Sequence, residues 1–107
     1  MARVVKRETK AQQEAKKLLA PVPEEKVFWG SDGRVLRDMR ELGEALTTMS
    51  DETFAYHCNS EKKDFSNWVR DVIGDDQLAR RLTLVMNRTE AASAVASRVS
   101  TLSRNLA

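Results

Sequence analysis

One stretch gives the strongest helical signal in the chain and decides the fold: Asp64-Phe65-Ser66-Asn67-Trp68-Val69-Arg70-Asp71-Val72-Ile73-Gly74-Asp75. Its large apolar side chains recur with the spacing of one helical face, at Phe65, Trp68, Val69 and Val72. Asp64 can act as an N-cap or a first-turn acid, and Gly74 lies where a left-handed C′ residue belongs. Because aromatic rings bring the largest buried area to a small core, we expect this helix to lie at its centre.

Length and composition predict one soluble domain. The chain has 107 residues, of which 41% are hydrophobic and 32% are charged. No apolar run approaches the roughly 20 residues of a membrane helix, and the N-terminus lacks the apolar stretch of a secretory signal. The lone Cys58 cannot form an internal disulfide, which agrees with a reducing compartment. We therefore expect a cytoplasmic protein with no membrane association.

Charge is distributed unevenly along the chain. Residues 1–20 carry six basic and two acidic side chains, residues 21–76 seven and thirteen, and residues 77–107 five and one. The three segments therefore have net charges of +4, −6 and +4, which add to the formal +2 of the whole chain. An acidic centre between basic ends can mark an anion-binding or self-associating protein.

Three segments follow from the apolar spacing and the prolines. Residues 1–20 form a basic helical arm that can move independently; its apolar face is thin and rich in alanine, so we expect it to dock weakly. Residues 21–26 form a linker that contains Pro21 and Pro23. Residues 27–107 form a single helical domain.

Capping signals divide the domain into helices. Asp38, Ser50, Asp75 and Thr89 are the predicted N-caps of four helices besides the one over residues 64–74. The predicted core positions, which share the inward faces of these helices, are Leu42, Leu46, Phe54, Phe65, Trp68, Val69 and Val72. The sequence thus predicts a mostly α fold, with about five short helices packed around Trp68 and a small β-hairpin at Asp32-Gly33.

A dense pattern of residues runs through about half of the chain: Ser31-Asp32-Gly33, Leu36, Glu41-Leu42, Ala45-Leu46, Met49-Ser50-Asp51-Glu52, Phe54, His57, Asn59, Asp64-Phe65, Asn67-Trp68-Val69, Asp71-Val72 and Gly74-Asp75. Through this pattern, residues 28 to about 82 resemble a family of small uncharacterised prokaryotic domains that occur mainly in archaeal proteins. The resemblance implies no activity, and the basic arm and the last helix lie outside it. Cys58 stands where the family suggests an apolar residue, and a buried cysteine behaves as one.

His57, Cys58 and Asp64 form the only cluster that suggests a metal or a nucleophile. One cysteine and one histidine cannot supply the four ligands of a zinc site, and adjacent residues on a helix diverge by about 100°. We therefore interpret His57 as a structural histidine, bonded to neighbouring backbone or to Asp64. The acidic pairs Asp51-Glu52 and Asp75-Asp76 stand at predicted helix N-termini, where they stabilise the dipole. The sequence predicts no catalytic residues, no metal, no cofactor and no enzyme.

Basic side chains near both ends of the chain are the candidate contacts for a partner: Lys6, Arg7, Lys10, Arg80, Arg81 and Arg88. Solvated helix faces explain much of this pattern, but clustered cations also fit an acidic protein surface or a phosphate backbone. We expect a small non-catalytic binding module that takes part in a protein assembly, or self-associates, through its basic terminal segments. The alternative is a nucleic-acid-binding or ribosome-associated protein, although the acidic centre would repel a duplex that lay flat across the domain.

Trp29 allows two interpretations. An aromatic residue in a small domain is normally part of the core, and we favour this interpretation. The alternative is a partly exposed anchor for a partner.

Overall fold

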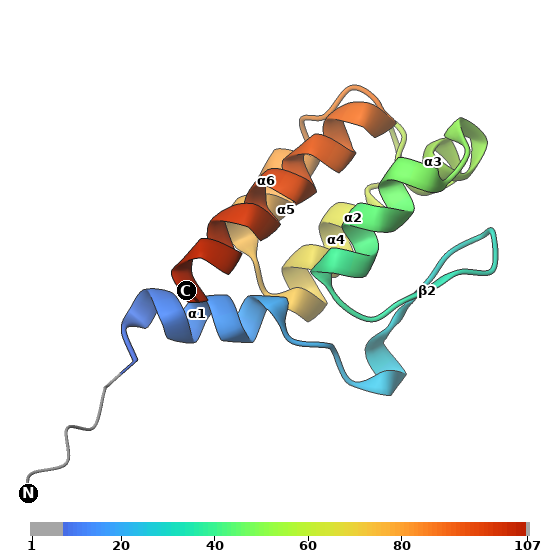
Figure 1. Ribbon diagram of the computed structural model, residues 1–107. Helices are drawn as coiled ribbons and strands as arrows, with labels where there is room; N and C mark the ends of the chain where they lie inside the picture. The colour runs from blue at the N-terminus through green and yellow to red at the C-terminus, as the bar shows by residue number, and fades with distance from the viewer. Residues whose placement is uncertain (1–7, 107) are drawn as a thin grey trace, which may run out of the picture.

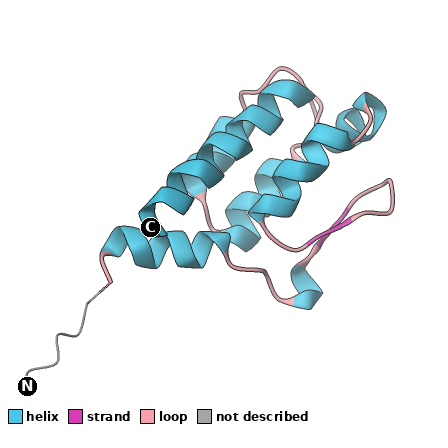
Figure 2. Ribbon diagram, viewed as in Figure 1, coloured by secondary structure: helices cyan, strands magenta, loops and turns pink. Residues whose placement is uncertain are grey.

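Helices make up most of residues 8–106, the part of the chain that the computed structural model describes (Figures 1 and 2). The α-helices are α1 (Lys10–Leu19), α2 (Met39–Thr48), α3 (Asp51–His57), α4 (Asp64–Trp68), α5 (Asp76–Leu82) and α6 (Arg88–Leu106). Strands β1 (Phe28–Trp29) and β2 (Val35–Leu36) form an antiparallel hairpin, a 3₁₀ turn η1 (Glu24–Lys26) precedes it, and a π turn η2 (Val69–Ile73) continues α4. The predicted mostly α fold with a small hairpin is confirmed.

Helix α6 is the longest element, and α1, α2 and α5 all pack against it (Figure 1). Its inward face consists mainly of small side chains, which let the other helices approach closely: Ala91, Ala94, Val95 and Leu102. A Cβ atom on Gly43 of α2 would lie 3.3 Å from Cγ1 of Val95, so these two helices are near their closest separation. α6 is therefore the helix on which α1, α2 and α5 are assembled.

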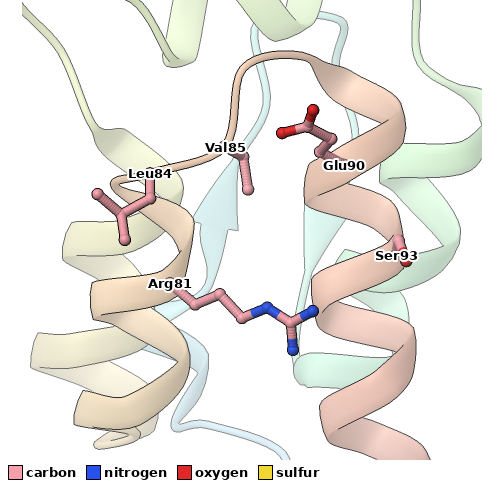
Figure 3. A pocket seen from close by; sticks show the side chains of 5 residues that line it. All are labelled: Arg81, Leu84, Val85, Glu90 and Ser93. Atoms are coloured by element: carbon pink, nitrogen blue, oxygen red, sulfur yellow. The ribbon is translucent and has the colours of Figure 1, made fainter.

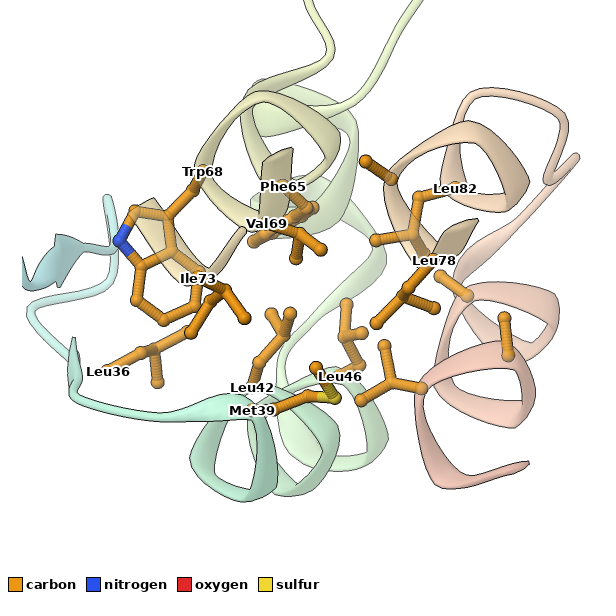
Figure 4. Packing of buried hydrophobic residues seen from close by; sticks show 14 of the residues in the cluster. Leu36, Met39, Leu42, Leu46, Phe65, Trp68, Val69, Ile73, Leu78 and Leu82 are labelled. Atoms are coloured by element: carbon orange, nitrogen blue, oxygen red, sulfur yellow. The ribbon is translucent and has the colours of Figure 1, made fainter. Parts of the chain in front are cut away.

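The core lies between α2, the α4–η2 segment and α5 (Figure 4). Leu42 and Leu46 are fully buried on α2, and Phe65, Trp68 and Val69 face them from the opposite side. Phe28 of β1 joins this cluster, with its ring centroid 5.1 Å from that of Phe65 and 5.8 Å from that of Trp68. The indole Nε1 of Trp68 also donates to the carbonyl of Lys26, 2.9 Å away, and so attaches η1 to the core.

The π turn shifts the buried face by one residue. The amides of Gly74 and Asp75 both donate to the carbonyl of Val69, at 2.8 and 3.1 Å, and Gly74 has the predicted left-handed conformation with φ of 91°. Because a π turn contains one residue more than an α turn, Ile73 takes the buried position that α-helical spacing assigned to Val72. Val72 is only partly buried at the edge of the core.

The hairpin has a longer loop than the predicted two-residue turn. Gly33 donates from its amide to the carbonyl of Gly30 at 3.0 Å, and Gly30 donates to the carbonyl of Arg34 at 2.8 Å. Gly33 has φ of 91°, so the loop is a turn followed by a left-handed glycine, a common three-residue hairpin connection.

Helix α1 buries its apolar stripe in the fold, and the weak docking expected of it stays a prediction. Ala15, Leu18 and Leu19 are buried, with exposed fractions of 0%, 4% and 8%. The small side chain of Ala15 lets α1 lie close to α6, against which it packs. Residues 10–19 therefore contribute to the packed core.

Replacing Trp68 with alanine should lower the free energy of unfolding by about 3–5 kcal/mol, because a large buried side chain and its hydrogen bond are lost. Chemical denaturation at low protein concentration measures this change. The matched control is Trp29→Ala, which removes an indole that is 71% exposed and should change stability by no more than about 0.5 kcal/mol. Equal effects of the two substitutions would contradict the position of the core.

Replacing Leu18 with alanine should cost about 2–5 kcal/mol if α1 is an integral part of the core. The neighbouring Lys17→Ala is the control, since Lys17 is exposed on the same helix. A denaturation midpoint unchanged by Leu18→Ala would show that α1 docks as weakly as its composition suggests.

Candidate partner-binding surface

The predicted basic residues do not form one continuous surface. Lys6 and Arg7 lie outside the described residues, whereas Lys10 begins α1 and is exposed. Arg80 and Arg81 are exposed in the last turn of α5. α1 lies beside the C-terminal end of α6, and α5 ends beside the N-terminal end of α6 (Figure 1). Lys10 and the two arginines are therefore separated along the molecule.

Arg88, predicted as a partner contact, has a structural role within the fold. Its Nη1 donates to the carbonyls of Leu46 and Thr47 at 2.9 and 3.2 Å, and its Nε donates to Oδ1 of Asp51 at 3.0 Å. Carbonyls in the last turn of a helix have no amide of the same helix to accept from. The Arg88 guanidinium donates to two such carbonyls at the end of α2. Arg88 thus joins α6 to the α2–α3 junction.

Arg80 and Arg81 are different, because neither side chain forms an ion pair or a hydrogen bond within residues 8–106. Immediately after them, the loop from α5 to α6 exposes two large apolar side chains, Leu84 and Met86, which are 77% and 84% exposed. We call these four residues the α5–α6 corner. The cations of the corner were predicted from the sequence, but its apolar part was not. The available signal was that Leu84 and Met86 fall outside the apolar stripe of α5.

The loop of the corner is held by hydrogen bonds where it enters α6. The Glu90 carboxylate accepts from the amide of Met86 at 3.0 Å, and Asn87 Oδ1 accepts from the amide of Glu90 at 2.9 Å. Asn87 is therefore the residue that caps α6, and the predicted cap at Thr89 is wrong. Below the loop is a shallow hollow of about 270 Å³, toward which the Arg81 side chain extends between α5 and α6 (Figure 3).

His57 is structural, as predicted. Its Nε2 accepts from the amide of Ser31 at 2.9 Å, so Nδ1 carries the proton that is donated to Oδ2 of Asp64, also 2.9 Å away. The ring is 5% exposed and contacts the rings of Phe28 and Phe65. These contacts fix the hairpin loop to the junction between α3 and α4.

Cys58 is not arranged as a nucleophile. Burial raises the pKa of its thiol, which lowers the thiolate fraction at neutral pH, and the positive charge of Lys63 only partly opposes this effect. No group of three or more histidine, cysteine, aspartate or glutamate side chains in residues 8–106 is arranged to hold a metal ion.

A buried ion pair joins three helices and was missed in the sequence. Asp75 is 2% exposed and caps α5 by accepting from the amide of Leu78 at 3.1 Å, as predicted. Its other oxygen accepts from Nε of Arg98 on α6 at 2.7 Å. The same guanidinium reaches Oε1 of Glu14 on α1, 3.3 Å away. In the sequence, the only signal for this pair was the charged Arg98 among the small residues of the last helix.

Trp29 is exposed, so its interpretation as a core residue is wrong. Successive side chains of a strand point to opposite faces, and Phe28 points into the aromatic cluster. Trp29 therefore points outward and is 71% exposed, opposite Val35 in the register of the hairpin.

Comparisons of the chain with protein-family models, with curated proteins and with solved structures found no match. Within residues 8–106, none of the helices has the length and apolar character needed to cross a bilayer.

Replacing Arg98 with methionine should cost about 3–5 kcal/mol, because the buried carboxylate of Asp75 loses its partner. The double variant Asp75→Asn/Arg98→Met should be less destabilised than Arg98→Met alone, since asparagine can still cap α5 and carries no charge. Chemical denaturation of both variants measures the coupling between the two side chains. Full stability of the Arg98→Met protein would exclude this ion pair as a support of the fold.

Proposed function

We propose that this chain is a small non-catalytic module that takes part in a protein assembly, and that the α5–α6 corner is its contact surface. The observation that carries the proposal is the combination of two exposed apolar side chains, Leu84 and Met86, with two arginines, Arg80 and Arg81, that have no internal partner in residues 8–106. Arginine, methionine and aromatic residues are enriched at protein interfaces.

The apolar half of the corner favours a protein partner over nucleic acid. Phosphate backbones are recognised by cations and polar groups, and a leucine and a methionine next to those cations would gain little from them. An apolar side chain of a protein partner would cover Leu84 and Met86, while its carboxylates would pair with the guanidinium groups. The distance between Lys10 and the corner along α6 also weighs against a continuous phosphate-binding track.

The use of the chemically versatile side chains supports a non-catalytic role. Two pairs of these side chains bind each other, His57 with Asp64 and Asp75 with Arg98. His57 and Asp75 also accept from backbone amides. The resemblance to small archaeal domains remains a prediction and suggests no reaction.

The proposal is tested by immobilising the chain and passing over it a nuclease-treated extract of the organism that encodes it. Wild type should retain a defined protein, and the variants Leu84→Ser/Met86→Ser and Arg80→Gln/Arg81→Gln should each lose it. The control is Leu106→Ser, which changes an exposed leucine at the end of α6 and should retain the same protein.

A salt titration with labelled duplex DNA and RNA tests the alternative. A nucleic-acid-binding protein would bind at micromolar concentration, and substituting Gln at Lys6, Arg7, Lys10, Arg80 and Arg81 would reduce the salt slope by about 0.9 per lost contact on duplex DNA. Such binding, insensitive to Leu84→Ser/Met86→Ser, would contradict the proposed function.

A further inference from the structure

We infer that the partner of the α5–α6 corner is a second copy of this chain, which binds through a surface on the hairpin. The inference rests on the proposed function, because it names what the corner binds. We call the receiving surface the hairpin face and define it as Trp29, Val35, Glu24 and Glu25.

The hairpin face combines apolar area with negative charge. Trp29 is the large aromatic side chain most exposed to solvent in residues 8–106, and Val35 lies opposite it on the same side of the hairpin. Glu24 and Glu25 lie on η1, just before β1, and neither carboxylate forms an ion pair within residues 8–106. Lys26 is the only cation of this turn, and Arg34 in the hairpin loop already pairs with Asp32 at 3.5 Å.

The corner and the hairpin face match in chemistry. Arginine forms strong pairs with carboxylates and stacks on indole rings, so Arg80 and Arg81 suit both glutamates and Trp29. The thioether of Met86 also packs favourably against an aromatic ring. The two arginines of the corner and the two glutamates of the hairpin face form no ion pairs within residues 8–106, so their opposite charges are free to pair between two copies.

One copy cannot make this contact with itself. Figure 1 places the hairpin and the loop between α5 and α6 on different edges of the molecule. The proposed contact is heterologous: the corner of one copy binds the hairpin face of another, and a bound pair leaves one hairpin face and one corner free. Repetition of a heterologous contact gives open chains unless the rotation closes a ring.

The test uses the full chain alone and needs no other ligand. Sedimentation velocity and light scattering of wild type, over a series reaching millimolar protein, should show association that increases with concentration and weakens with salt. Arg80→Glu/Arg81→Glu should weaken it by about tenfold or more, and Trp29→Ser should do the same. All three residues are exposed, so thermal melting should show both variants folded.

The charge control is Lys17→Glu/Arg104→Glu, which changes the net charge equally at exposed positions outside both surfaces. This variant should associate like wild type.

A mixing experiment tests the orientation of the contact. The Arg80→Glu/Arg81→Glu protein keeps an intact hairpin face, and the Trp29→Ser protein keeps an intact corner. An equimolar mixture should form one-to-one dimers that do not grow further, because only one functional contact remains.

Three results would overturn the inference: a wild type that stays monomeric at millimolar concentration, a Trp29→Ser protein that associates like wild type, or a mixture that forms no dimer. A monomeric wild type that still loses a captured protein on Leu84→Ser/Met86→Ser would overturn the second copy as partner and leave the proposed function standing. Capture of nucleic acid alone would overturn both.

Discussion

The buried carboxylate of Asp75 is the interaction on which the arrangement of the helices depends. It caps α5, binds Arg98 in the middle of α6, and through that guanidinium is connected to Glu14 of α1. A buried charge is costly unless it is paired and hydrogen bonded, so this carboxylate strongly disfavours any arrangement that separates α5 from α6. The α5–α6 corner is built on the same two helices, and its geometry therefore depends on a pair located away from it.

The aromatic cluster imposes a second constraint, this time on the hairpin. Phe28 inserts among Phe65, Trp68 and His57, and the alternation of strand side chains then directs Trp29 to solvent. Two strands of two residues each would be marginal alone, and the contacts of Phe28 and the bond from Ser31 to His57 anchor them. The exposure of Trp29 is thus a consequence of how the core is packed.

Apolar spacing and capping residues were enough to predict the helices, because both signals are local. Asp38, Ser50 and Asp75 each accept an amide hydrogen bond at a helix start, and Gly74 ends the segment that contains Trp68. The π turn could not be predicted in the same way, since one extra residue in a turn leaves no mark in composition. It changed which of two neighbouring apolar residues is buried.

The candidate surface was predictable only in part, because the partners of a charged side chain are set by the tertiary fold and not by local sequence. The positions of Arg80 and Arg81 in the sequence indicate their charge, but only the fold shows that they lack internal partners in residues 8–106 whereas Arg88 and Arg98 have them. The burial of α1 could not be predicted from its own apolar stripe, because the contact depends equally on the small residues of α6.

Rigidity connects this architecture to binding. Ordering a flexible loop costs free energy when a partner binds, and a loop that is already held avoids most of that cost. Glu90 and Asn87 fix the segment that presents Met86, and the capped α5 fixes the arginines before it. Leu84 and Met86 bury little of their apolar area within their own chain, so most of that area is available to a partner that covers them. The bonds that hold the corner in place would thus lower the ordering cost of the association proposed for it.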